Sequence, residues 1–183
     1  MGGFSLPDDK IAPDPFAEIV NLEDVSNCQD VSKGDLPPRI NGLFGGILDR
    51  KIIICGGYDP DLHSYIGGCR KVTIVDNEIV DEEFAQFPPI AFGAYSQFLD
   101  QNSEKIIFSG GKTTGEVLQN DISTLDDKGH YEVIGKLSES ISDHCMVAIS
   151  NHTMIIIGGM SLTSNTKKST VVIRLNESNC YTV

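Results

Sequence analysis

The sequence has no long apolar run and few basic residues for its number of acids. No stretch approaches the roughly 18 apolar residues of a membrane-spanning helix, and residues 1–7 lack the charged start and apolar centre of a signal peptide. Lysine and arginine number 14 against 26 aspartate and glutamate, giving a net charge of −12. Because this charge repels polyanions, we expect neither nucleic acid nor a membrane surface as a partner.

Motifs for metal, phosphate or nucleophilic chemistry are also missing. None of the five cysteines forms a CxxC pair, and the histidines are dispersed. Asp143-His144-Cys145 is a cluster of ionisable groups, but neighbours along a strand point to opposite faces and cannot converge on a ligand. Gly111-Lys112-Thr113 imitates a phosphate loop without its preceding glycine or a following helix pattern. We therefore expect no catalytic residue, no metal and no cofactor.

What the sequence does contain is a repeated pair of glycines. The second glycines of successive pairs are 54, 54 and 48 residues apart. The pairs are Gly2-Gly3, Gly56-Gly57, Gly110-Gly111 and Gly158-Gly159. Three pairs follow an aliphatic run, at 51–55, 105–109 and 154–157, which predicts a short strand apolar on both faces. Glycine tolerates the positive φ of a sharp turn, and a fixed period of about 40 to 50 residues is typical of propeller blades.

Aligned on the glycines, each unit predicts four strands, the content of a propeller blade. The units are a half blade at 2–35 and full blades at 36–87, 88–137 and 138–183. The expected strands are 18–22 and 28–31; 40–48, 51–55, 71–75 and 84–87; 92–99, 105–109, 121–125 and 131–134; 144–150, 154–157, 171–175 and 180–183. The acids at 8–9, 81–83 and 126–127 are expected in turns. The predicted fold is all-β, an open propeller of four-stranded antiparallel blades.

These units resemble the kelch repeat. Leu36-Pro37-Pro38-Arg39 matches the opening of its unit and Gly56-Gly57-Tyr58-Asp59 its centre. The kelch tryptophan is absent, and its place is taken by Cys28, Phe84, Tyr131 and either Cys180 or Tyr181. The resemblance implies a propeller fragment of about three and a half blades, since the chain opens inside a glycine pair. Its open blade edges would favour self-association.

Cys55 and Cys69 flank a 13-residue loop and could face each other across a hairpin. A disulfide closing such a loop would stabilise the fold by about 3 kcal/mol, and the alternative is two buried free thiols. Similar cysteine pairs are found in secreted invertebrate kelch-like proteins, which favours an extracellular over a cytoplasmic location. Asn151 and Asn176 fit the N-glycosylation pattern and fall in predicted turns.

The loops that leave the Gly-Gly strands, at 58–68, 112–120 and 160–169, are the expected binding surface. Tyr58, His63 and Tyr65 lie in the first of them, and tyrosine suits a contact residue because it combines apolar area with a polar tip. The resemblance implies a non-enzymatic scaffold that binds a protein or peptide. Two alternatives stay open: part of a propeller enzyme similar to galactose oxidase, and the substrate-recognition part of a ubiquitin-ligase adaptor.

Overall fold

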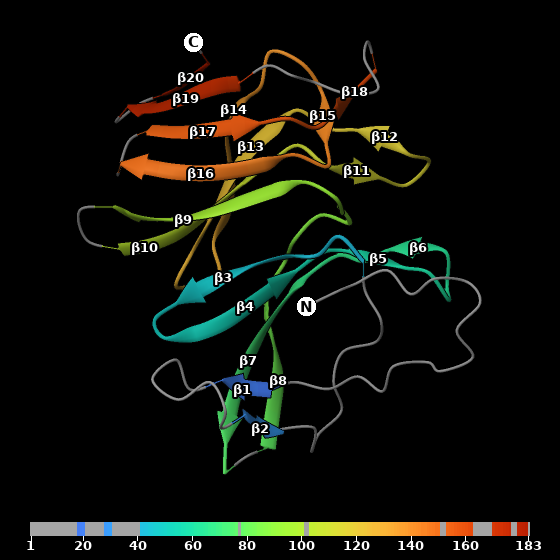
Figure 1. Ribbon diagram of the computed structural model, residues 1–183, viewed down its shortest axis with the longest axis vertical. Helices are drawn as coiled ribbons and strands as arrows, with labels where there is room; N and C mark the ends of the chain where they lie inside the picture. The colour runs from blue at the N-terminus through green and yellow to red at the C-terminus, as the bar shows by residue number, and fades with distance from the viewer. Residues whose placement is uncertain are drawn as a thin grey trace.

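The protein is built from β-strands joined by turns (Figure 1). The computed structural model describes residues 18–20, 28–30, 41–76, 78–100, 103–150, 153–162, 170–176 and 179–182. This part of the chain contains no helix, so none of it forms a helix able to cross a membrane. It forms several antiparallel sheets, and these sheets close into neither a barrel nor a ring. The expected all-β class is confirmed.

Three four-stranded antiparallel sheets make up most of the molecule. In each sheet the strands are hydrogen-bonded in the order in which they occur along the chain. The first sheet contains β3 (Phe44–Leu48), β4 (Lys51–Cys55), β7 (Cys69–Val75) and β8 (Glu78–Ala85). The second contains β9 (Ala94–Asp100), β10 (Ser103–Ser109), β13 (Asp121–Asp126) and β14 (Tyr131–Lys136). The third contains β16 (Cys145–Ser150), β17 (Thr153–Ile157), β19 (Thr170–Asn176) and β20 (Asn179–Thr182). They lie within the predicted units 36–87, 88–137 and 138–183.

Four two-stranded sheets accompany them. One pairs β1 (Glu18–Val20) with β2 (Cys28–Asp30), within the range of the predicted half unit. The others are β5 (Tyr58–Asp59) with β6 (Ser64–Tyr65), β11 (Lys112–Thr113) with β12 (Val117–Leu118), and β15 (Ile141–Ser142) with β18 (Met160–Ser161). Figure 1 shows the last three on one side of the molecule, opposite the turn that joins β3 to β4. The predicted loops are thus partly ordered into small hairpins.

The core lies between neighbouring large sheets. One cluster, which includes Phe44 and Phe108, fills the space between the first and second sheets, and another, which includes Met146, fills that between the second and third. The second sheet is covered on both faces, so Ile106 and Ile107 are each 0% exposed. The expectation of strands buried on both faces is correct for this sheet.

One predicted strand was misplaced. The expected 84–87 strand is instead β8, which spans Glu78–Ala85 and includes the acids at 81–83 that were expected in a turn. Asp76, with a φ of +52°, closes a tight hairpin after β7, so pairing resumes almost at once. The acids are accommodated by bases on the neighbouring strand: Asp81 is 2.6 Å from Arg70, and Glu82 is 2.6 Å from Lys71.

The described glycine pairs adopt the predicted backbone conformation. All six glycines have positive φ, for example +60° at Gly56 and +105° at Gly111. A Cβ at Gly56 would lie 2.3 Å from the Ile90 carbonyl oxygen, so the backbone of the next unit passes too close for a larger residue. Gly2 and Gly3 lie outside the described residues. The glycine pairs therefore mark places where one sheet touches the connection into the next.

Candidate functional site

Backbone hydrogen bonds connect the three large sheets at the hairpin side of the molecule. Gly42, Phe92 and Asp143 occupy equivalent positions, each shortly before the first strand of its sheet. The Phe92 amide donates to the Gly42 carbonyl at 2.9 Å, and the Asp143 amide donates to the Phe92 carbonyl at 2.6 Å. These three residues therefore form a short chain of contacts that runs from sheet to sheet.

A second set of hydrogen bonds repeats with the same period. The Gly57 amide donates to the Ile90 carbonyl at 2.8 Å, and the Gly111 amide donates to the Ile141 carbonyl, also at 2.8 Å. In both cases the second glycine of a pair holds the segment that leads into the following sheet. Because each contact is made by backbone atoms, it fixes where the neighbouring hairpins emerge, whatever their side chains.

The hairpins bring aromatic side chains together on this surface. The rings of Tyr58 and Tyr65 meet edge to face with centroids 5.2 Å apart, and the Tyr58 ring lies 6.4 Å from that of Phe92. The Tyr58 hydroxyl and His63 Nδ1 share a hydrogen bond of 3.2 Å. Both tyrosines are half-buried, so each ring keeps part of its area open to solvent. Such rings offer apolar area with polar tips.

Charged side chains extend this surface across the second and third sheets. The Tyr65 hydroxyl donates to Glu116 at 2.6 Å, and burial together with this bond raises the pKa of Tyr65. Lys112 Nζ lies 5.3 Å from the Phe92 ring centroid and 3.2 Å from the Asp143 carboxylate. The rim cluster is defined as Tyr58, His63, Tyr65, Phe92, Lys112, Glu116 and Asp143. It joins loops from all three sheets into one continuous surface.

Four members of the rim cluster have a strained backbone. The φ angles are +49° at His63, +58° at Phe92, +60° at Glu116 and +54° at Asp143. A non-glycine residue in this left-handed region costs about 1–2 kcal/mol. Glycine would avoid that cost at each position. Such strain is concentrated at binding and catalytic sites, which makes this surface the leading candidate site.

Sequence reasoning identified part of the rim cluster. The structure places the predicted Tyr58, His63 and Tyr65 in contact around one hairpin. It also adds members that were not selected, namely Phe92, Lys112, Glu116 and Asp143. Lys112 had a detectable signal, because it directly follows its glycine pair, as Tyr58 does. Whether the predicted residues bind a partner stays a prediction.

Ser109 and His144 form a buried polar pair below the rim. Ser109 Oγ and His144 Nε2 share a hydrogen bond of 2.9 Å, and the Ser109 hydroxyl donates to Met146 Sδ at 3.6 Å. His144 Nδ1 has no hydrogen-bond partner among the described residues. Burial lowers the pKa of His144 to about 4. A serine and a histidine in contact can form a nucleophile and base, but these residues are 1% and 6% exposed, which favours a structural role.

The predicted disulfide is present. Cys55 and Cys69 are opposite each other on β4 and β7, with Cα atoms 4.1 Å apart, and their sulfur atoms are bonded. Cys145 is free and exposed.

Asn176 is the last residue of β19, and Asn151 lies outside the described residues, so glycosylation at either position stays a prediction.

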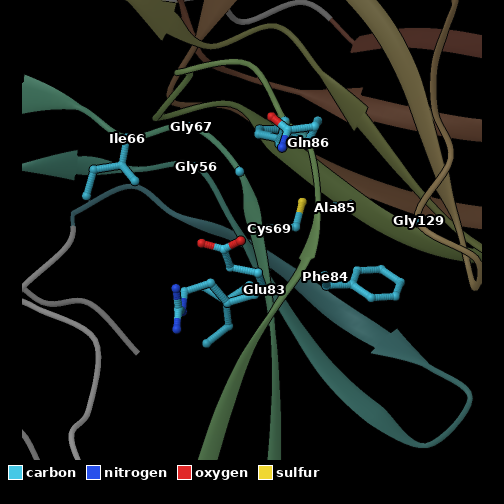
Figure 2. A pocket seen from close by; sticks show the side chains of 13 residues that line it. Gly56, Ile66, Gly67, Cys69, Glu83, Phe84, Ala85, Gln86 and Gly129 are labelled. Carbon is cyan, nitrogen blue, oxygen red and sulfur yellow. The ribbon is translucent and has the colours of Figure 1, made fainter.

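A cavity of about 730 Å³ lies away from the rim, beside the ends of β7 and β8 (Figure 2). Its wall includes Cys69, Glu83 and Arg70, with Gly129 of the second sheet nearby. Arg70 is already paired with Asp81 at 2.6 Å. Across the described ranges, no three histidine, cysteine or acidic side chains gather in a way that could hold a metal ion. The cavity thus offers less binding chemistry than the rim cluster.

Comparison with known proteins finds a structural likeness but no family. The solved structure of YjhT matches this chain with a TM-score of 0.52 at 11% sequence identity. The match covers 92% of this chain and 75% of the YjhT chain, and at this identity it concerns the fold alone. No protein-family model matches the chain, and no curated protein matches it.

Proposed function

We propose that this protein is a non-enzymatic interaction module that binds a protein or peptide through the rim cluster. In this proposal its three large sheets are consecutive blades of an open, kelch-type β-propeller. The likeness to YjhT, a β-propeller-like protein, supports this architecture, as do the hydrogen bonds that recur from sheet to sheet. The Cys55–Cys69 disulfide supports an oxidising, extracellular location over the cytoplasm.

The observation that carries the proposal is the continuity of the rim cluster across three sheets. Tyr65 reaches Glu116 on the next hairpin, and Lys112 reaches Asp143 in the connection into the third sheet. A partner lying on this surface would touch loops from every sheet while the sheets themselves stay rigid. Half-buried aromatic rings surrounded by polar groups are the typical composition of a protein-binding surface.

Leu62 allows a test that leaves the fold intact, because it lies on the same hairpin as His63 and is 73% exposed. Peptides that bind the immobilised protein are first selected from a displayed library. Leu62→Ser is then expected to weaken their binding about fivefold, since it removes exposed apolar area beside the contact surface whose burial is worth about 1 kcal/mol. Val133→Ser, at a 47% exposed position on β14, serves as the control and should change binding less than twofold. If both substitutions weaken binding equally, the rim is not the binding surface.

A further inference from the structure

The charge of the rim cluster indicates what kind of partner it can bind. Three exposed acids, Asp61, Glu116 and Asp143, lie on or beside the cluster, with Lys112 as its basic member. Lys112 is only 18% exposed in its side chain and is already held by Asp143 at 3.2 Å. The charge left for a partner is therefore negative, in agreement with the net charge of −12 on the whole chain.

Glu116 is the acid best placed to meet a partner. Its side chain is 69% exposed, yet one carboxylate oxygen accepts the 2.6 Å hydrogen bond from Tyr65. The other oxygen lies 3.9 Å from Lys112 Nζ, a long ion pair that leaves it accessible. A carboxylate that is already oriented loses less conformational entropy when it pairs with an incoming cation.

The chain already shows how a cation is held on this surface. Lys112 Nζ lies 5.3 Å from the Phe92 ring centroid while pairing with the Asp143 carboxylate. Tyr58 and Tyr65 beside Glu116 form a similar combination of aromatic rings and a carboxylate, and Lys112 Nζ, at 3.9 Å from Glu116, pairs more closely with Asp143. An aromatic face next to a carboxylate suits a guanidinium, which stacks on rings and pairs with acids at once.

We propose that the rim cluster binds a basic side chain, arginine above all, of a peptide partner through Tyr58, Tyr65 and Glu116. This inference rests on the proposed function, because it specifies the partner of the same surface. The guanidinium would pair with the open oxygen of Glu116 and lie against the tyrosine rings. Tyr65 would act by orienting Glu116.

The probe is the peptide acetyl-Gly-Arg-Gly-Arg-Gly-amide, compared with the same peptide carrying citrulline or glutamate in place of arginine. Citrulline keeps the shape of arginine but has no charge. In titrations followed by NMR, the arginine peptide is expected to shift the amide signals of residues 58–65 and 112–118. Its binding should weaken as the salt concentration is raised. Glu116→Gln should weaken binding about fivefold and Tyr65→Phe about twofold, the range of an exposed ion pair. Glu132→Gln removes an exposed acid from β14 and should have no effect.

The outcomes separate this inference from the proposed function. Equal shifts with the citrulline peptide, or an equal loss from Glu116→Gln and Glu132→Gln, would refute recognition of a basic side chain while leaving a rim that binds peptides. An arginine peptide that shifts only residues elsewhere would refute the inference. If library peptides also bind away from the rim, the proposed function fails as well.

Discussion

Replacing Gly111 with alanine tests whether the glycine pairs are contacts between sheets. A Cβ at Gly111 would lie 2.6 Å from Ile90 Cγ2 and 2.8 Å from the Ala91 carbonyl oxygen. Shifting the neighbouring atoms to make room for this Cβ typically costs about 1–3 kcal/mol. A φ of +105° adds about 1–3 kcal/mol of backbone strain for alanine. We expect Gly111→Ala to lower the free energy of unfolding by about 4 kcal/mol and the melting temperature by about 12 °C.

Gly115 provides the matched control, because its φ of +79° is also positive but the nearest atom, Val117 Cγ2, is 4.0 Å from the added Cβ. Gly115→Ala should cost only about 1 kcal/mol, the strain without the overlap. Urea unfolding followed by circular dichroism gives both values. Equal losses for the two variants would refute the reasoning, because strain alone would then account for the effect and the close approach between sheets would contribute nothing.

Two further changes test the buried groups. The pKa of His144 is about 4 in the fold against an ordinary 6.5, so the unfolded chain takes up the proton first, and stability should fall by about 3 kcal/mol as the pH drops from 6.5 to 4. His144→Gln keeps a hydrogen-bond partner for Ser109. The unfolding free energy of this variant should no longer fall between pH 6.5 and 4 by the amount due to His144. Parallel pH profiles for the variant and the unchanged protein would show that His144 is not the group responsible. Replacing Cys55 and Cys69 together with serine should lower the unfolding free energy by about 3 kcal/mol, and a loss below about 1 kcal/mol in urea titrations would show that closing this loop contributes little.

The strands that bear the repeat were predictable from sequence because their signals are local. Aliphatic runs before glycine pairs gave β4, β10 and β17 to within two residues. The error at β8 arose because acids normally indicate turns, whereas here Asp81 and Glu82 pair with bases on β7. The two-residue strands of the small hairpins are too short to leave any periodicity in the sequence.

The rim cluster was only partly predictable because its members come from separate loops. Tyr58 and Tyr65 belong to one loop of the repeat, so loop position and residue type were enough to select them. Glu116 is 51 residues from Tyr65, and nothing in either loop indicates that they meet. Their contact depends on the angle between two sheets, which is set by packing and by backbone hydrogen bonds such as the one between Phe92 and Gly42. Sequence patterns carry the period of a repeat but not that angle.

Amide hydrogen exchange tests most directly the claim that successive sheets are held in register at the rim. The Phe92 and Asp143 amides lie outside the large sheets, yet each donates to the carbonyl of the equivalent residue in the preceding unit. The account predicts that both exchange as slowly as amides inside β10. If they exchange as fast as the amide of Gly115 in the exposed β11–β12 turn, the sheets are not joined there, and the continuous rim cluster does not exist.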